Sequence, residues 1–258
     1  MQTLRNKLFF YGTTAMVGLV SLGLHRVMME QYIDEKGLLI AGNMPAILLW
    51  VLGIVFVLLM CFKADTLGGE GSYEDDFPRD IFSGGLLIAA GLMLALAVPG
   101  MERTAPGGGQ AGFAAAAMDM AGSLLPWLAA ASMVVLGVCR LLGRRPWAIL
   151  GGLICLFYMM MLVRNYRLWS ADPQVQDYAY QLLAGVLLML CAFHRTCCDA
   201  GVIQRKKLIL TGLMAAGCCL AALSMPFQQN FYLASALWGF GCICAPSVLP
   251  MDPEENEE

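Results

Sequence analysis

The residues with the clearest capacity for chemistry are two thiols and an imidazole spaced along one predicted helix. Cys191, His194 and Cys198 stand at positions i, i+3 and i+7, so a helix places them on one face. Thiolate and imidazole groups bind zinc or copper. One helix cannot close a four-ligand site by itself, however, and a buried cysteine usually behaves as a small hydrophobic residue. We therefore expect no metal and no cofactor, and these three residues are the candidate ligands should a metal bind.

The other reactive groups give little support to catalysis. None of the ten cysteines falls in a segment predicted to face the outside, so we expect free thiols rather than exported disulfides. The second histidine, His25, ends the first predicted span and is expected to be an interfacial side chain. No HExxH, GxSxG or kinase-type motif occurs. The sequence favours a non-enzymatic protein, and a membrane-embedded enzyme that uses the thiols between Cys191 and Cys198 stays an alternative.

A second polar group lies where the chain is predicted to emerge on the outer side. Arg167, Asp172, Asp177 and Gln181 fall close together, and Asn43 lies near the start of the second predicted span. If Asn43 and Gln181 face a common space, these residues could form a shallow ligand-binding vestibule. The alternative is an interfacial belt, because arginine and the neighbouring aromatic residues favour the headgroup level of a bilayer. Both interpretations stay open.

These residues are carried by a chain that is almost entirely apolar. Of its 258 residues 59% are hydrophobic and 14% are charged. With glycine counted and tyrosine left out, the apolar share is about two-thirds, against roughly 45 to 50% in soluble domains. The net charge of −3 offers no basic surface for nucleic acid. The sequence therefore predicts an integral membrane protein whose main partner is the lipid bilayer.

Eight apolar runs are each about long enough to cross a hydrocarbon core of about 30 Å as a helix. They are Leu8–Leu24, Leu38–Phe62, Ile81–Gly100, Met118–Cys139, Trp147–Val163, Tyr178–Phe193, Leu208–Ser224 and Phe231–Leu249. The predicted fold is an all-α polytopic transmembrane helical bundle. In the sixth run Gln181 interrupts the apolar stretch, and a re-entrant segment there would reduce the count to seven.

The distribution of basic residues predicts the orientation of the bundle. With the N-terminus inside, eleven of the sixteen lysines and arginines fall on inner segments and five on outer segments. Cytoplasmic loops accumulate such residues, so both termini are predicted to be cytoplasmic, with residues 250–258 as a short acidic tail. Cleavage of the first run as a signal peptide is the alternative for the N-terminus.

The predicted loops are short, so residues 1–258 form a single integral membrane domain without a separate soluble fold. The acidic, glycine-rich inner loop Lys63–Asp80 has a composition that disfavours packing. Small residues at helical spacing, such as Gly91 with Ala95 and Gly212 with Ala216, predict faces where helices approach closely.

Two segments carry a resemblance to other proteins. The sequences DEKGLLIAGN (Asp34–Asn43) and RLWSADPQVQDYAYQLL (Arg167–Leu183) resemble parts of uncharacterised multi-pass membrane proteins of Gram-positive anaerobes. The resemblance covers about a fifth of the chain. It implies a membrane location and a helical bundle, and it assigns no functional residue.

Two functional classes follow from these observations. The first is a non-enzymatic subunit or accessory factor of the bacterial cytoplasmic membrane, with a membrane-protein partner or a homo-oligomer as its working form. The alternative is a permease or facilitator for a small or amphipathic solute, with an outward-facing mouth near Asn43 and Gln181. The absence of charged residues from the predicted bilayer core disfavours a proton-driven pump.

Overall fold

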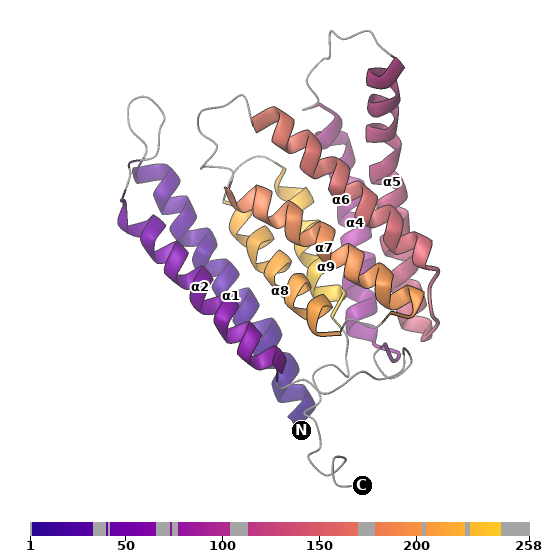
Figure 1. Cartoon of the computed structure of the whole chain (residues 1–258), viewed down its shortest axis with the longest axis horizontal. Helices are drawn as coiled ribbons and strands as arrows, with labels where there is room; N and C mark the ends of the chain where they lie inside the picture. The colour runs from indigo at the N-terminus through magenta and orange to yellow at the C-terminus, as the bar shows by residue number, and fades with distance from the viewer. Residues whose placement is uncertain are drawn as a thin grey trace.

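The computed structural model describes residues 2–32, 40, 42–65, 73, 77–103, 113–169, 179–202, 205–224 and 228–243. Within these residues the chain forms eight helices and no strand (Figure 1). They are α1 (Gln2–Gln31), α2 (Met44–Asp65), α4 (Ile81–Arg103), α5 (Phe113–Leu142), α6 (Ala148–Trp169), α7 (Ala179–Ala200), α8 (Arg205–Ala222) and α9 (Gln229–Gly241). The all-helical architecture predicted from the sequence is confirmed for the described part of the chain.

Six of these helices are long and apolar enough to cross a membrane. Their apolar segments are Leu8–Gln31, Met44–Lys63, Ile81–Gly100, Ser123–Leu142, Ala148–Tyr166 and Ala179–Ala200. The shortest has 19 residues and so measures about 28 Å, close to the thickness of a hydrocarbon core. Six such helices fit a multi-pass membrane protein.

The last three predicted spans differ from one another in length. The sixth is a continuous helix, because α7 runs over 22 residues, about 33 Å, and includes Gln181. The helix α8 has 18 residues and begins with three basic ones, and α9 has 13 residues. Residues 244–249, which complete the eighth predicted span, lie outside the described part of the chain, as does the predicted tail 250–258. The count of eight crossings therefore stays a prediction.

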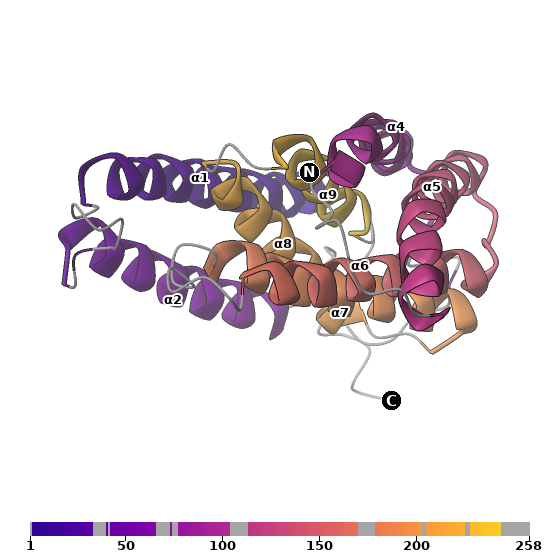
Figure 2. The same ribbon diagram turned by 90° about the horizontal axis from the view of Figure 1, so that it is seen from above.

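Two helices form the centre of the bundle. The helix α8 packs against α1, α2, α7 and α9, while α9 packs against α4, α7 and α8. Figures 1 and 2 show α1 and α2 on one side of this centre and α4 and α5 on the other. Ten of the 18 residues of α8 and eight of the 13 of α9 are buried. These two helices therefore form the core of the bundle, with neighbouring helices on several sides.

Glycines let the central helices and the α4–α5 pair approach closely. A Cβ atom on Gly239 would lie 2.7 Å from the carbonyl oxygen of Gly212, and one on Gly91 would lie 2.7 Å from that of Ala130. Any larger residue at these places would push two backbones apart. The predicted packing role of Gly91 and Gly212 is thus confirmed.

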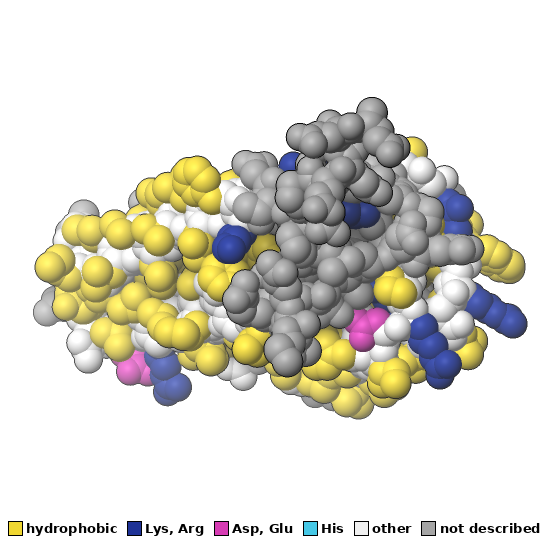
Figure 3. All heavy atoms as spheres, turned by 90° about the horizontal axis from the view of Figure 1, so that it is seen from below, with side chains coloured by type: hydrophobic (Ala, Val, Ile, Leu, Met, Phe, Trp, Pro, Cys, Tyr) yellow, Lys and Arg dark blue, Asp and Glu magenta, His cyan; other side chains and the backbone are white. Residues whose placement is uncertain are grey.

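Contacts between helix termini define two opposite ends of the molecule. The Tyr11 hydroxyl, near the start of α1, donates to the carbonyl of Phe240 at the end of α9 (3.2 Å), and its ring meets that of Phe82 at the start of α4. At the opposite end His25 of α1 lies against Tyr180 at the start of α7. Following the predicted topology, we call the end with Tyr11 the inner end and the other the outer end. Figure 3, seen from below, shows the inner end, with basic side chains at several points and hydrophobic side chains on the flanks.

Candidate functional site

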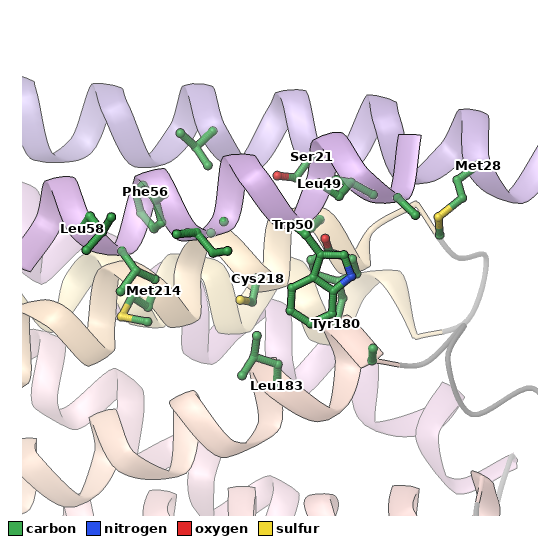
Figure 4. A pocket seen from close by; sticks show the side chains of 18 residues that line it. Ser21, Met28, Leu49, Trp50, Phe56, Leu58, Tyr180, Leu183, Met214 and Cys218 are labelled. Carbon is green, nitrogen blue, oxygen red and sulfur yellow. The ribbon is translucent and has the colours of Figure 1, made fainter. Parts of the chain in front are cut away.

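An apolar groove of about 760 Å³ lies between α1, α2, α7 and α8 (Figure 4). It follows α2 from Ala46 to Leu58, a rise of about 18 Å. The other lining residues are Val17, Ser21 and Met28 of α1, Leu49, Trp50, Gly53, Ile54, Phe56 and Val57 of α2, Ala179, Tyr180 and Leu183 of α7, and Met214, Gly217, Cys218 and Ala221 of α8.

The groove arises because α2 packs on one side only. This helix has the highest mean hydropathy of the six candidate spans, 2.8, yet only 22% of it is buried. It contacts α1 and, over fewer residues, α8, and leaves a space toward α7. Gly53 widens this space, since a Cβ atom there would meet nothing within 4 Å. Apolar side chains facing a space of this kind are stable in lipid and would be unfavourable in water.

The lining changes in character along the groove. Figure 4 shows Ser21, Trp50 and Tyr180 near the outer end, and Phe56, Leu58 and Met214 farther along α2 and α8. A hydroxyl, an indole N–H and a phenol are thus available at the outer end, and the inner part offers only hydrocarbon and thioether. None of the lining residues is Lys, Arg, Asp or Glu. This arrangement suits a molecule with a polar head that carries no charge and an apolar tail.

His25 lies directly behind the outer part of the groove and is fully buried. Its Nδ1 atom pairs with the Ser224 hydroxyl just after α8, and its ring lies edge-on to Tyr180 of α7, with centroids 5.1 Å apart. Among the described residues its Nε2 atom has no hydrogen-bond partner. The predicted interfacial level of His25 stays a prediction, while its side chain is buried between α1, the start of α7 and the residues just after α8.

The residues predicted to form an outer vestibule are not brought together in the described structure. Asn43 caps α2, since its Oδ1 accepts from the Ala46 N–H (2.8 Å) and its Nδ2 donates to the Ile40 carbonyl (2.7 Å). Gln181 is buried in α7 and does not line the groove. The backbone of Arg167 belongs to α6, but its side chain lies outside the described residues, as do Asp172 and Asp177 entirely.

The three candidate metal ligands occupy different surroundings. Cys191 and Cys198 are buried, while His194 is half-buried with its ring against Phe193. Cys191 pairs with the thiol of Cys242, the residue that follows α9. In the described part of the chain no group of three His, Cys, Asp or Glu residues could hold a metal ion, and the nine cysteines it contains are free thiols.

A buried ion pair holds the inner end together. The Arg195 Nη2 atom lies 3.1 Å from Asp199 Oδ1, with side chains 3% and 0% exposed. The Tyr73 hydroxyl also donates to Asp199 Oδ1 (3.1 Å), and the Arg145 Nε–H donates to the Asp199 carbonyl (2.9 Å). Three distant segments, the α2–α4 connection, the α5–α6 connection and the end of α7, therefore meet at Asp199.

Aromatic rings complete this inner cluster. Phe77 stacks on Tyr73, and the Arg195 guanidinium lies 4.2 Å from the centre of the Phe77 ring. Burial raises the pKa of the Tyr73 phenol, which keeps it protonated as a donor to Asp199. The prediction that the loop Lys63–Asp80 does not pack is wrong for Tyr73 and Phe77. Both are aromatic residues in an otherwise acidic segment, which was the signal in the sequence.

Comparison of the chain with protein-family models, with curated proteins and with solved structures finds no match.

Proposed function

We propose that this multi-pass membrane protein binds an amphipathic, uncharged molecule in the groove between α2 and α7 and acts as a permease or facilitator for it. The observation that carries this proposal is the graded lining of the groove, with hydrogen-bonding groups at the outer end and apolar side chains inward. An amphipathic ligand would place its head near Ser21, Trp50 and Tyr180 and its tail along Phe56 and Met214. The graded lining of the groove supports our preference for the permease interpretation over the accessory-factor interpretation.

The size of the groove supports a lipid-like ligand. Its volume of 760 Å³ falls within the range of about 300 to 1000 Å³ found for small-molecule sites. Its length also matches about one leaflet of the bilayer, roughly 15 Å.

The same proposal includes the topology. All eight helices would cross the bacterial cytoplasmic membrane, with both termini in the cytoplasm and the polar end of the groove facing outward. Eight alternating crossings would bring the starts of α1 and α4 and the end of α9 to one side of the membrane, and the end of α1 and the start of α7 to the other. The contacts of Tyr11 and of His25 agree with this arrangement. The eleven basic residues on the inner segments support the inward orientation of that end.

Photo-crosslinking in lipid nanodiscs tests the ligand site. The probe is a monoacylglycerol with a diazirine in its acyl chain, and excess monoolein is the competitor. We expect labelling at Leu183 and Met214 that monoolein suppresses. Labelling at the exposed residues Leu92 and Leu96 of α4 reports bulk lipid and should resist competition.

A matched pair of variants tests whether the probe binds in the groove. Gly53→Phe fills it without a backbone clash, while Gly85→Phe adds the same side chain to an equally open position on α4. Gly53→Phe should lower the competed labelling about tenfold or more, which corresponds to 1.4 kcal/mol of binding, and Gly85→Phe should leave it unchanged. If monoolein suppresses labelling at none of the four sites in the parent protein, the proposal is contradicted. The accessory-factor interpretation then returns to first place.

A further inference from the structure

A second apolar hollow lies beside the groove, between α6 and α7. Its volume is about 550 Å³, which also falls within the range of about 300 to 1000 Å³ found for small-molecule sites. One phenol and five aliphatic side chains line it, and none of them is charged. They are Leu162, Val163 and Tyr166 of α6, and Leu182, Leu183 and Val186 of α7.

The two hollows meet at Leu183. This side chain lines the groove, where Figure 4 shows it on α7 near Tyr180, and it also lines the second hollow. The groove continues from it along α2 and α8, and the second hollow continues along α6. A single aliphatic side chain therefore separates two apolar spaces.

Two close contacts fix the register of α6 against α7. A Cβ atom on Gly151 would lie 2.6 Å from the Thr196 Oγ1 atom, and one on Gly185 would lie 3.0 Å from the Leu162 side chain. Between the two contacts α6 advances by eleven residues and α7 goes back by eleven. The helices are therefore antiparallel, and the same register holds along their length.

This register brings two tyrosines to one level at the outer end. Tyr166 is four residues beyond Leu162 on α6, and Tyr180 is five residues before Gly185 on α7, so their levels differ by about 1.5 Å. Tyr166 lines the second hollow and Tyr180 lines the groove. Leu183 lies about 4.5 Å farther in than Tyr180. Each hollow thus has a phenol at the outer level and apolar side chains farther in.

We propose that the ligand of the groove is a lipid with two acyl chains and one uncharged head, a diacylglycerol in its chemistry, that straddles Leu183. One chain lies in the groove beside Met214, the other lies in the second hollow beside Val186, and the head lies at the level of Tyr166 and Tyr180. Phenols donate to and accept from the ester and hydroxyl oxygens of such a head. Neither hollow is lined by a charged side chain, so an ionic head would have no counter-charge there. This inference rests on the proposed function and adds the second chain to it.

A probe with two reactive chains tests whether one molecule occupies both hollows. The probe is a diacylglycerol with a diazirine in each acyl chain, irradiated with the full-length protein in lipid nanodiscs. Mass spectrometry should find peptides that contain Met214 and Val186 joined by one lipid, and excess dioleoylglycerol should reduce this product about tenfold. The single-chain monoacylglycerol probe should label Met214 with competition by monoolein, and any labelling at Val186 should resist that competition.

A matched pair of variants locates the second chain. Val163→Trp fills the second hollow, and Val138→Trp places the same side chain on α5 at a position that lines neither hollow. The two valines are 42% and 41% exposed, so neither substitution enlarges the buried core. Val163→Trp should reduce the bridged product about tenfold and leave the competed single-chain labelling at Met214 unchanged, which also shows that the variant is folded. Val138→Trp should leave both unchanged.

The outcomes separate this inference from the proposed function. Competed labelling at Met214 without a bridged product would overturn the two-chain ligand and leave the groove as a single-chain site. Competed labelling of Val186 by the single-chain probe would indicate two separate molecules and would also overturn it, as would a bridged product that Val163→Trp does not reduce. If labelling at Met214 is not competed by either lipid, the proposed function fails and this inference fails with it.

Discussion

Removing the carboxylate of Asp199 should destabilise the protein far more than removing both members of its ion pair. The partner, Arg195, is 3.1 Å away, and the two side chains are almost fully buried. Loss of one member of such a pair leaves an uncompensated buried charge, at a cost of about 3 to 5 kcal/mol. The Tyr73 hydroxyl would also lose its acceptor, which adds about 1 kcal/mol.

The double variant separates the ion pair from simple loss of packing. In Asp199→Leu/Arg195→Met neither charge of the pair remains, and the methionine can keep the contact of Arg195 with Phe77. Apolar replacement of a whole buried pair is often close to neutral. We therefore expect the double variant to lie within about 1 kcal/mol of the parent, so the two substitutions should couple by about 3 kcal/mol or more.

Thermal unfolding of the purified protein in detergent measures these differences. At about 2 to 4 °C per kcal/mol, Asp199→Leu should lower the melting temperature by about 6 °C or more. Glu30→Leu is the control, because Glu30 forms an Arg–acid pair of the same i, i+4 spacing with Arg26, with side chains 68% and 60% exposed. That pair should contribute about 1 kcal/mol or less. A loss in Asp199→Leu no larger than in Glu30→Leu, or a double variant as unstable as either single one, would refute the reasoning.

Three further predictions concern packing, capping and topology. Gly91→Val should destabilise by about 1 to 3 kcal/mol in the same assay, because its side chain would meet the Ala130 backbone, whereas Gly85→Val has open space and should cost under about 1 kcal/mol. Asn43→Ala should cost about 1 kcal/mol through loss of the α2 cap, and an unchanged melting temperature would remove that role. Reporter fusions in the α5–α6 and α7–α8 connections should report a cytoplasmic location, and those in the α1–α2 and α6–α7 connections an external one. The opposite pattern would invert the proposed orientation of the groove.

The helices could be predicted from the sequence because each depends on a local property. Apolar runs of about 20 residues are sufficient to indicate α1, α2 and α4, and glycine spacing was sufficient to indicate the close contact at Gly91. The N-cap role of Asn43 also had a local signal, since an asparagine stands just before Met44 and Pro45 at the start of an apolar run. That signal predicts a cap as directly as it predicts a vestibule.

The sites could not be predicted because they depend on pairs of residues far apart in the chain. Arg195 and Asp199 have the spacing of a helical ion pair, but Tyr73 contacts them from more than 120 residues away. His25 meets Ser224 across 199 residues. An interfacial histidine and one buried between three helices have the same local sequence, so burial was decided by which helices pack on α1.

The groove lies between the least supported helix and the most firmly held part of the bundle. The contacts of α2 are with α1 and, to a smaller extent, with α8, and most of its surface faces outward. By contrast, α7 is tied at its inner end through Asp199 to Tyr73 and Arg145, and it packs along its length on α6 and α8. A change in the width of the groove would break few contacts if α2 moved and many if α7 moved. The apolar wall formed by α2 is therefore the one that can give way to a ligand entering from the bilayer, while the wall with Tyr180 keeps its position.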